Sequence, residues 1–270
     1  MPYNHFLVDI QDKIATVSFN RPDKANALHM EAWDEMKSIF EQLSQTLEVR
    51  IIILKGEGKH FCSGIDLELL MSLNDMKKVS CEGRRGEQLR KFILKLQDAV
   101  SSIEKCSKPV IAAIQNGCIG GGIDIAVACD MRYCTDETYF TIKEIDMGMV
   151  ADLGTLQRLP KLIAPGVVSE MAYTGRKVYG SEAFALGLAN RSFGTIEELH
   201  SGVTEIAQTI AAKSPLSIRG IKEVLKFSRD HTVEDSLQQI ANWNAAMILS
   251  DDLTEAFKAT LEKRTPKYND

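Results

Sequence analysis

The chain has 270 residues, of which 44% are hydrophobic and 26% are charged. This length and composition are typical of a globular protein that buries a substantial core. The formal net charge of -5, from 32 basic and 37 acidic residues, gives no global reason to expect nucleic acid or an anionic membrane as a partner. No apolar run is long enough to span a bilayer, so no membrane association is expected.

The amino-terminal part predicts strands followed by a helix. Residues 6–10 and 14–19 indicate a hairpin around Gln11, Asp12 and Lys13. The turn that follows leads into a helix expected near residues 29–47.

The same order then repeats. Residues 51–54 predict a short buried strand, and apolar residues recur at helical spacing over residues 85–105. An apolar strand-like run at residues 107–114 follows. The repeating order of strand, strand and helix indicates an α/β fold.

A glycine-rich turn at residues 117–122 follows that strand. From Gly122 onward the sequence favours a buried helix, whose first N–H groups lack partners within the helix, so an oxyanion could bind there. Three consecutive glycines can also reflect only close packing of a helix against a strand. A nucleotide-binding turn is disfavoured, because the spacing is not Gly-x-Gly-x-x-Gly.

Three acidic residues, Asp124, Glu144 and Asp152, accompany this turn without an evident set of metal ligands. Proton transfer is therefore the leading hypothesis for the chemistry. Each acid also has a structural explanation. Asp124 could be a first-turn helix acid, Glu144 a solvated charge, and Asp152 the N-cap of a helix that begins near residue 154.

The carboxyl-terminal part is expected to be mainly helical. Strand signals become sparse after about residue 153, and the junction at Ser214-Pro215 is the best candidate for a break between layers. We expect a core at residues 1–200 and a helical region at residues 201–270, with no independent second domain.

The cysteines and histidines form no motif for metal binding or redox chemistry. The six cysteines include no Cys-x-x-Cys pair, and the five histidines include no His-Glu-x-x-His arrangement, so no metal site is expected. Cys62 beside Ser63 lies in no Gly-x-Ser-x-Gly elbow, which disfavours hydrolysis. Neither a leader pattern at the start nor a Ser-Lys-Leu ending is seen, so a cytoplasmic location is expected.

Separated motifs resemble the crotonase, or enoyl-CoA hydratase/isomerase, superfamily. These are NRPDKANAL at residues 20–28, FCSGIDL at residues 61–67 and the glycine turn. The resemblance covers nearly the whole chain and implies a spiral of strand-strand-helix turns, with a carboxyl-terminal helical region that assembles trimers, often paired as hexamers. It also implies that the N–H groups of Ile65 and Gly121 form an oxyanion hole around a thioester carbonyl.

Within this superfamily, residues 143–161 look most like the Δ3,5-Δ2,4-dienoyl-CoA isomerases. Typical hydratases of the family carry glutamate at the positions of Asp124 and Glu144, and glycine at that of Asp152. The resemblance implies isomerisation of 3,5-dienoyl-CoA to 2,4-dienoyl-CoA, in which Glu144 removes the C2 proton and Asp152 delivers one at C6. Asp124 is expected to be a third catalytic residue, which polarises its neighbours or tunes this pair. A 2-enoyl-CoA hydratase and a non-catalytic acyl-CoA-binding protein are the alternatives.

The resemblance also assigns residues to the coenzyme A part of the substrate. Lys24 is expected to pair with a phosphate, although a surface lysine can equally be solvated. Ala25 and Ser63 match main-chain positions that hold the adenine region, and Lys263 matches a lysine that reaches coenzyme A from the same or a neighbouring subunit. Coenzyme A belongs to the substrate, so no separate cofactor is expected. A homotrimer or homohexamer is the expected assembly.

Overall fold

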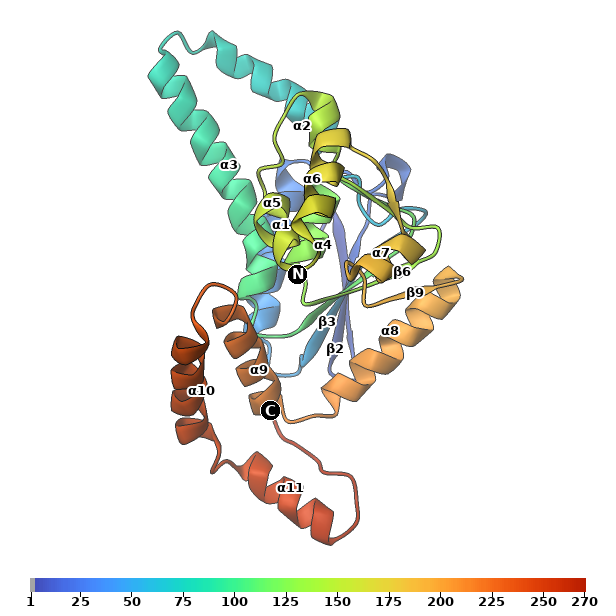
Figure 1. Ribbon diagram of the computed structural model, residues 1–270, viewed down its shortest axis with the longest axis vertical. Coiled ribbons are helices and arrows are strands. Elements are labelled where there is room, and N and C mark those ends of the chain that lie inside the picture. Colours follow the sequence, from blue (N-terminus) through green and yellow to red (C-terminus); the bar gives the residue numbers. More distant parts are fainter. Residues whose placement is uncertain (1–2) are drawn as a thin grey trace.

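The computed structural model describes residues 3–270 and is built around a six-stranded sheet in the order β1-β2-β3-β4-β6-β9 (Figure 1). β1 and β2 form an antiparallel hairpin, in which Asp12 and Lys13 have positive φ angles of 49° and 70°, as a tight turn requires. Every later pair of neighbours is parallel. The predicted hairpin and strands are confirmed as β1 (Phe6–Gln11), β2 (Ile14–Phe19), β3 (Ile51–Gly56) and β4 (Val110–Ile114). β6 (Met131–Thr135) and β9 (Arg191–Phe193), which the sequence pattern did not predict, complete the sheet.

Both faces of this sheet are buried. Side chains alternate between its faces, so Ile52 and Leu54 of β3 join one apolar cluster while Ile51 and Ile53 join another. The first cluster includes side chains of α1 (Met30–Gln45), α3 (Glu82–Lys105) and α4 (Gly121–Ala128), and the second includes those of α8 (Ile196–Ala211). The sheet therefore lies between α8 on one face and α1, α3 and α4 on the other (Figure 1).

The helices α1 and α3 confirm the predicted helical segments. His29 caps the start of α1, where its Nδ1 accepts a hydrogen bond from the Ala32 N–H at 3.4 Å. α3 is a single helix of 24 residues that packs against α1 at its carboxyl-terminal end and extends outward at its other end, where it contacts the turn Leu73–Lys78 that follows α2 (Leu67–Ser72) (Figure 1). The sequence pattern did not predict α2 or this turn.

A second, three-stranded sheet brings two parts of the candidate site together. It consists of β5 (Gly117–Ile119), β7 (Tyr139–Thr141) and β8 (Val178–Tyr179). β5 and β7 are parallel, so they end at the same edge, and the Gly120 N–H donates to the Thr141 carbonyl at 3.0 Å. The glycine turn leads from β5 into α4, and the 3₁₀ turn Lys143–Met147, which carries Glu144, follows β7. Gly120 and Glu144, which are 24 positions apart in the sequence, are thereby brought next to each other.

The carboxyl-terminal part is mainly helical, as predicted, although β8 and β9 lie within it. Its helices are α5 (Thr155–Arg158), α6 (Pro165–Thr174), α7 (Gly180–Leu186), α8, α9 (Pro215–Phe227), α10 (Val233–Met247) and α11 (Asp251–Leu261). Among residues 3–270, no helix combines the length and the apolar character that a membrane crossing requires.

The predicted division at residues 200 and 201 falls inside α8. Leu199, Val203 and Ala207 of this helix pack against the six-stranded sheet, so α8 belongs to the core. α9 to α11 follow the Ser214-Pro215 junction and extend from the core at one end of the long axis (Figure 1). Packing therefore places the division at that junction rather than at residue 200.

Two buried cations attach this extension to the core. The Lys222 Nζ of α9 lies 2.8 Å from an Asp130 carboxylate oxygen and donates to the Lys108 carbonyl at 2.8 Å. The Arg50 guanidinium, next to β3, donates to the Asp270 carboxylate at 2.7 Å and so holds the end of the chain.

Candidate active site

A cavity of about 400 Å³ lies between the glycine turn, α3 and the segment that precedes α5. Its wall is mostly apolar and comes from α2, the turn after it, α3 and residues 149–153. Four residues predicted from the sequence line it: Ile65, Gly121, Glu144 and Asp152. The structure thus brings the predicted amide donors and two of the predicted carboxylates to one cavity.

Two main-chain N–H groups in this cavity are unpaired. The Leu28 N–H donates to the Gly64 carbonyl and the Asp66 N–H donates to the Leu28 carbonyl, which leaves the Ile65 N–H between them without an acceptor among residues 3–270. Gly121 is the first residue of α4, and its N–H likewise has no acceptor in the described chain. A Cβ placed on Gly121 would lie 3.5 Å from the Ile65 nitrogen. Both donors are therefore close enough to bind one oxygen atom.

Gly64 keeps these two donors accessible. Its φ is +83°, and a Cβ at this position would lie 2.6 Å from the Gly121 nitrogen. Any side chain here would crowd the Gly121 N–H and strain the main chain. Gly64 lies in the FCSGIDL motif, but the sequence predicted no role for it; its place directly before Ile65 was the available signal.

Glu144 is held beside the glycine turn. A Cβ on Gly120, where φ is +52°, would lie 3.2 Å from the Glu144 Oε1. The Glu144 Oε2 is buried and has no hydrogen-bond partner among residues 3–270. Burial, together with the charges of Asp124 and Asp152, raises the pKa of Glu144 to about 7. Because the Oε2 atom is buried, the interpretation of Glu144 as a solvated charge is wrong, and Lys143 pairs with Asp146 instead.

Asp124 lies behind the cavity wall. Its side chain is 0% exposed, and its Oδ1 accepts a hydrogen bond from the Thr155 N–H at 2.6 Å. Its Oδ2 is buried without a partner among residues 3–270. Burial raises the pKa of Asp124 to about 6, although the hydrogen bonds from Thr155 oppose this rise. Asp124 is not among the residues that line the cavity, so it can act on the cavity only through its field and its contacts.

Asp152 is exposed in the single chain and lines the cavity. Burial of part of the group raises the pKa of its carboxyl. Gly154 is the N-cap residue of α5 and makes no side-chain cap, whereas Asp124 accepts the hydrogen bond from Thr155, the first residue of that helix. The interpretation of Asp152 as an N-cap is therefore wrong, and its carboxyl is left for another role.

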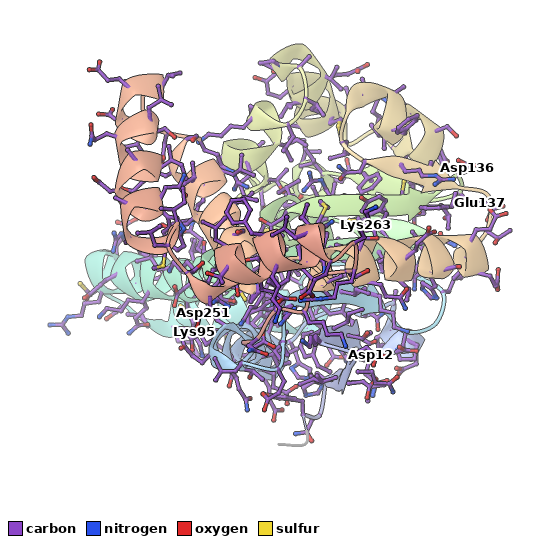
Figure 2. The ribbon with its side chains drawn as sticks, turned by 90° about the horizontal axis from the view of Figure 1, so that it is seen from below. Asp12, Lys95, Asp136, Glu137, Asp251 and Lys263 are labelled. Carbon is purple, nitrogen blue, oxygen red and sulfur yellow. The ribbon has the colours of Figure 1, made fainter. Side chains whose placement is uncertain are left out.

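Three of the four residues expected to bind coenzyme A lie together. The Ser63 N–H donates to the Ala25 carbonyl at 3.0 Å, and Lys24, the residue before Ala25, is exposed. Ser63 is only two residues from Ile65, so this group is continuous with the cavity. Lys263 follows α11, at the opposite end of the long axis from α2, and Figure 2 shows it on that end of the molecule.

Asn26 organises this region, and sequence reasoning missed it. It is 1% exposed, adopts a φ of +56°, and its Oδ1 accepts a hydrogen bond from the Arg21 N–H at 2.9 Å. Its Nδ2 donates to the carbonyl of His60 at 2.8 Å. An asparagine inside the NRPDKANAL motif was the available signal, since asparagine tolerates positive φ better than most residues.

The structure also bears on the cysteines and histidines. Burial raises the pKa of the Cys62 thiol to about 12, so it is a poor nucleophile at neutral pH. All six cysteines are free. His5, His29 and Glu31, which the sequence did not connect, have ligand-type atoms within 4.8 Å of one another outside the cavity. There the His29 Nδ1 already accepts the hydrogen bond that caps α1.

Comparison with known proteins agrees with this geometry. Residues 9–270 match the family model for enoyl-CoA hydratase/isomerase, and the chain belongs to this family and has the crotonase fold. It is 49% identical over 250 residues to the peroxisomal Delta(3,5)-Delta(2,4)-dienoyl-CoA isomerase of Arabidopsis thaliana, which covers 92% of this chain and 90% of the relative. The mitochondrial enzyme of that name from Mus musculus is 42% identical and covers 95% and 79%.

The fold is also similar to that of a hydratase of known structure. The crystal structure of an enoyl-CoA hydratase from Bacillus anthracis has a TM-score of 0.89 and 29% identity, and the match covers 98% of this chain and 99% of that one. The predicted family and fold are confirmed, and the chain is more similar to these isomerases than to this hydratase.

Proposed function

We propose that this chain is an isomerase that converts 3,5-dienoyl-CoA to 2,4-dienoyl-CoA. The observation that carries the proposal is the single cavity lined by the unpaired N–H groups of Ile65 and Gly121 and by the carboxyl groups of Glu144 and Asp152. Two amide donors fit a thioester oxygen, and two carboxyl groups fit a reaction that moves a proton between separate carbons. The names of the relatives at 49% and 42% identity describe this reaction.

The amide donors make the first step feasible. Removing a proton from C2 places negative charge on the thioester oxygen, and the Ile65 and Gly121 N–H groups donate to that oxygen. One such donor is worth about 3 kcal/mol in a site of this kind. The positive end of α4 adds to this stabilisation, because Gly121 begins the helix.

The two carboxyl groups carry out separate steps of the proton transfer. Glu144 removes a proton from C2, and the resulting dienolate spreads its charge to C6, where Asp152 delivers a proton. The double bonds at C3 and C5 become double bonds at C2 and C4, so one C–H bond breaks and one forms. After each cycle Glu144 holds the proton that Asp152 has lost, and a proton must move between them or exchange with solvent before the next cycle.

Asp124 tunes this pair rather than touching substrate. Its charge helps raise the pKa of Glu144, and its own pKa is about 6 because it is buried. A base with a pKa near the working pH combines availability with strength. The same placement disfavours hydration, which would need Asp124 in the cavity to help position a water molecule.

The remaining residues suit the rest of the substrate. Lys24, Ala25 and Ser63 lie beside the Ile65 end of the cavity and would hold coenzyme A, which is part of the substrate, so no separate cofactor is needed. The apolar wall from α2 and α3 would hold the acyl chain. A cytoplasmic location stays a prediction; the names of the two relatives place them in peroxisomes and mitochondria.

We also propose that chains assemble into a homotrimer or homohexamer through α9 to α11. Large apolar side chains are exposed on this extension, including Leu225 at 61%, Leu237 at 63% and Phe257 at 64%. Assembly would cover these side chains and could bring Lys263 to the coenzyme A of a neighbouring subunit. Light scattering coupled to gel filtration measures this directly, and a monomer at micromolar concentration would oppose the proposal.

An absorbance assay tests the proposed activity against the alternatives. With a 3,5-dienoyl-CoA, an isomerase generates the absorption of the conjugated 2,4-diene. With a 2-enoyl-CoA, a hydratase removes the enoyl chromophore. We expect the first signal and not the second, whereas a non-catalytic acyl-CoA-binding protein would give neither.

A further inference from the structure

The orientation of the Asp152 carboxyl group depends on a segment without regular secondary structure. Residues 149–154 join the turn that carries Glu144 to α5, and no strand or helix fixes them. The main chain of this segment is held at its start, where the Met149 N–H donates to the Glu144 carbonyl at 3.0 Å, and at its end by the bond from Thr155 to Asp124. Between these points the main chain of Asp152 needs another support.

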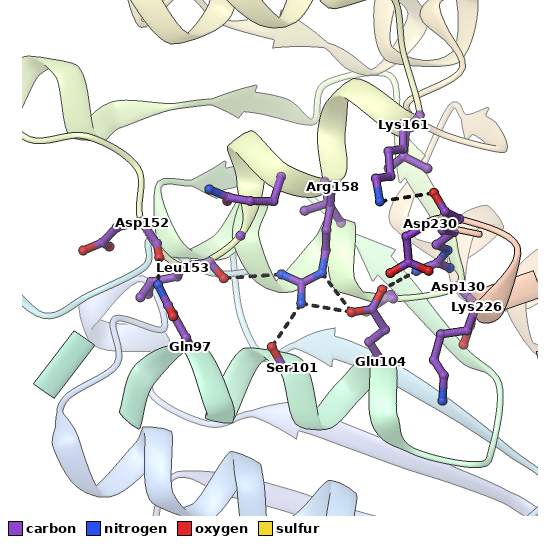
Figure 3. A pocket seen from close by; sticks show the side chains of 16 residues that line it. Gln97, Ser101, Glu104, Asp130, Asp152, Leu153, Arg158, Lys161, Lys226 and Asp230 are labelled. Atoms are coloured by element: carbon purple, nitrogen blue, oxygen red, sulfur yellow. Dashed lines mark hydrogen bonds and ion pairs between the residues drawn. The ribbon is translucent and has the colours of Figure 1, made fainter. Parts of the chain in front are cut away.

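Gln97 on α3 supplies that support. Its Nε2 donates a hydrogen bond to the main-chain carbonyl of Asp152 at 2.6 Å, and Figure 3 shows the two groups facing each other. The Asp152 carboxyl points away from this contact and from Arg158 (Figure 3). Gln97 therefore fixes the peptide group of Asp152 and leaves its side chain unobstructed.

The next peptide group is held from the same helix through Arg158. The Arg158 Nη1 donates to the Leu153 carbonyl at 3.4 Å, while its Nη2 lies 3.0 Å from the Glu104 carboxylate and 3.1 Å from the Ser101 hydroxyl. Gln97, Ser101 and Glu104 are spaced by four and three residues, so they occupy one face of α3. That face supports two consecutive carbonyls of the loop.

We propose that Gln97 is a positioning residue for the proton transfer at C6, an inference that rests on the proposed function. C2 and C6 are separated by four bonds, so the reaction depends on the distance between the carboxyl groups of Glu144 and Asp152. Glu144 is fixed by the edge of the small sheet, whereas the peptide of Asp152 is fixed by Gln97. Loss of the Gln97 donor shifts the acid at C6 and leaves the base at C2 in place.

The test separates these two half-reactions. In Gln97→Leu we expect exchange of the C2 protons of 3,5-dienoyl-CoA with D2O at the wild-type rate, and formation of the 2,4-diene slowed about 10- to 100-fold, the range that a displacement of about 1 Å produces. KM and the melting temperature should stay close to wild type. Gln97→Glu, which keeps the shape but loses the donor, should behave in the same way.

Lys95→Met is the matched control. Lys95 lies two residues earlier on α3 and pairs with Asp34 at the surface, so this variant should isomerise at the wild-type rate. Equal losses of exchange and isomerisation in Gln97→Leu, or no loss of isomerisation in either Gln97 variant, would overturn the proposal for Gln97. A wild-type protein that forms no 2,4-diene would instead overturn the proposed function.

Discussion

The buried carboxylate of Asp124 accepts a hydrogen bond at 2.6 Å from the main-chain N–H of Thr155, 31 residues later in the chain. This contact joins the first turn of α4, which offers the Gly121 N–H, to the first residue of α5, three residues after Asp152. Asp124 also helps raise the pKa of Glu144. Asp124 thus links the oxyanion donors, the base Glu144 and the loop that carries the proton donor Asp152.

Asp152→Asn should abolish the delivery of a proton at C6 while leaving substrate binding intact. Asparagine keeps the shape of the side chain but cannot act as an acid, and general acid catalysis contributes about 100- to 10,000-fold. We expect kcat to fall within that range, with the Kd of an acyl-CoA ester changed less than about threefold. Calorimetric titration provides the Kd, and a parallel loss of binding would indicate a structural role.

The pH dependence of kcat/KM should be bell-shaped. The reaction needs one proton on the pair formed by Glu144 and Asp152, so activity is lost when both are protonated and when both are ionised. Burial raises the pKa of Glu144 to about 7, which places the alkaline limb near pH 7, as an apparent value of the coupled pair.

Asp124→Asn should move that alkaline limb to lower pH. The negative charge of Asp124 raises the pKa of Glu144, so its removal lowers that pKa, and the pair loses its last proton at lower pH. The amide oxygen of asparagine can still accept the Thr155 hydrogen bond. Profiles of kcat/KM measured in parallel for both proteins test this, and an unshifted or upward-shifted limb would show that Asp124 does not act on Glu144.

The same variant should also be more stable than wild type above neutral pH. The pKa of Asp124 is about 6 in the folded state and close to 3.9 in the unfolded chain, so folding becomes less favourable as pH rises between these values. Asp124→Asn removes this cost, and the free energy of unfolding should rise by up to about 3 kcal/mol at pH 8, from a shift of about two pKa units. Urea unfolding should show a smaller gain at pH 5; a gain that is independent of pH would argue against a titrating Asp124.

Gly64→Ala should disable the oxyanion donors. The added Cβ would lie 2.6 Å from the Gly121 nitrogen, and the φ of +83° suits only glycine well. Loss of one such donor lowers kcat about 100- to 1,000-fold. Gly83→Ala is the matched control, because a Cβ there meets no atom within 4 Å, and it should keep wild-type activity. Near-normal turnover in Gly64→Ala would exclude these amides as the stabilising donors.

Periodicity and motifs anticipated most of the framework. The hairpin, α1 and α3 follow from apolar spacing, since each must bury one face. α2 was not anticipated, because it has no buried residue, and its Leu67 and Met71 are 60% and 69% exposed. The predicted division at residue 200 differs from the structure for a related reason. The apolar stripe of α8 indicates that one face of this helix is buried, but it does not indicate that this face packs on the six-stranded sheet.

The site could be predicted only where a motif carried it. The motifs predict Glu144 and Asp152, but they do not show whether Asp152 or another acid accepts hydrogen bonds from the N–H groups at the start of α5. That acid is Asp124, which is distant in sequence and meets Thr155 only after folding. The role of Gln97 could not be predicted from the sequence, because its side chain contacts a main-chain carbonyl, and every residue carries such a group.

Deuterium exchange at C2 in the absence of isomerisation tests the central claim most directly. When 3,5-dienoyl-CoA is incubated in D2O, mass spectrometry and absorbance separate the loss of the C2 proton from the formation of the 2,4-diene. We predict that Asp152→Asn incorporates deuterium at C2 without forming the diene, and that Glu144→Gln does neither. Diene formation at the wild-type rate in either variant would contradict the assignment of these two carboxyl groups to opposite ends of one proton transfer.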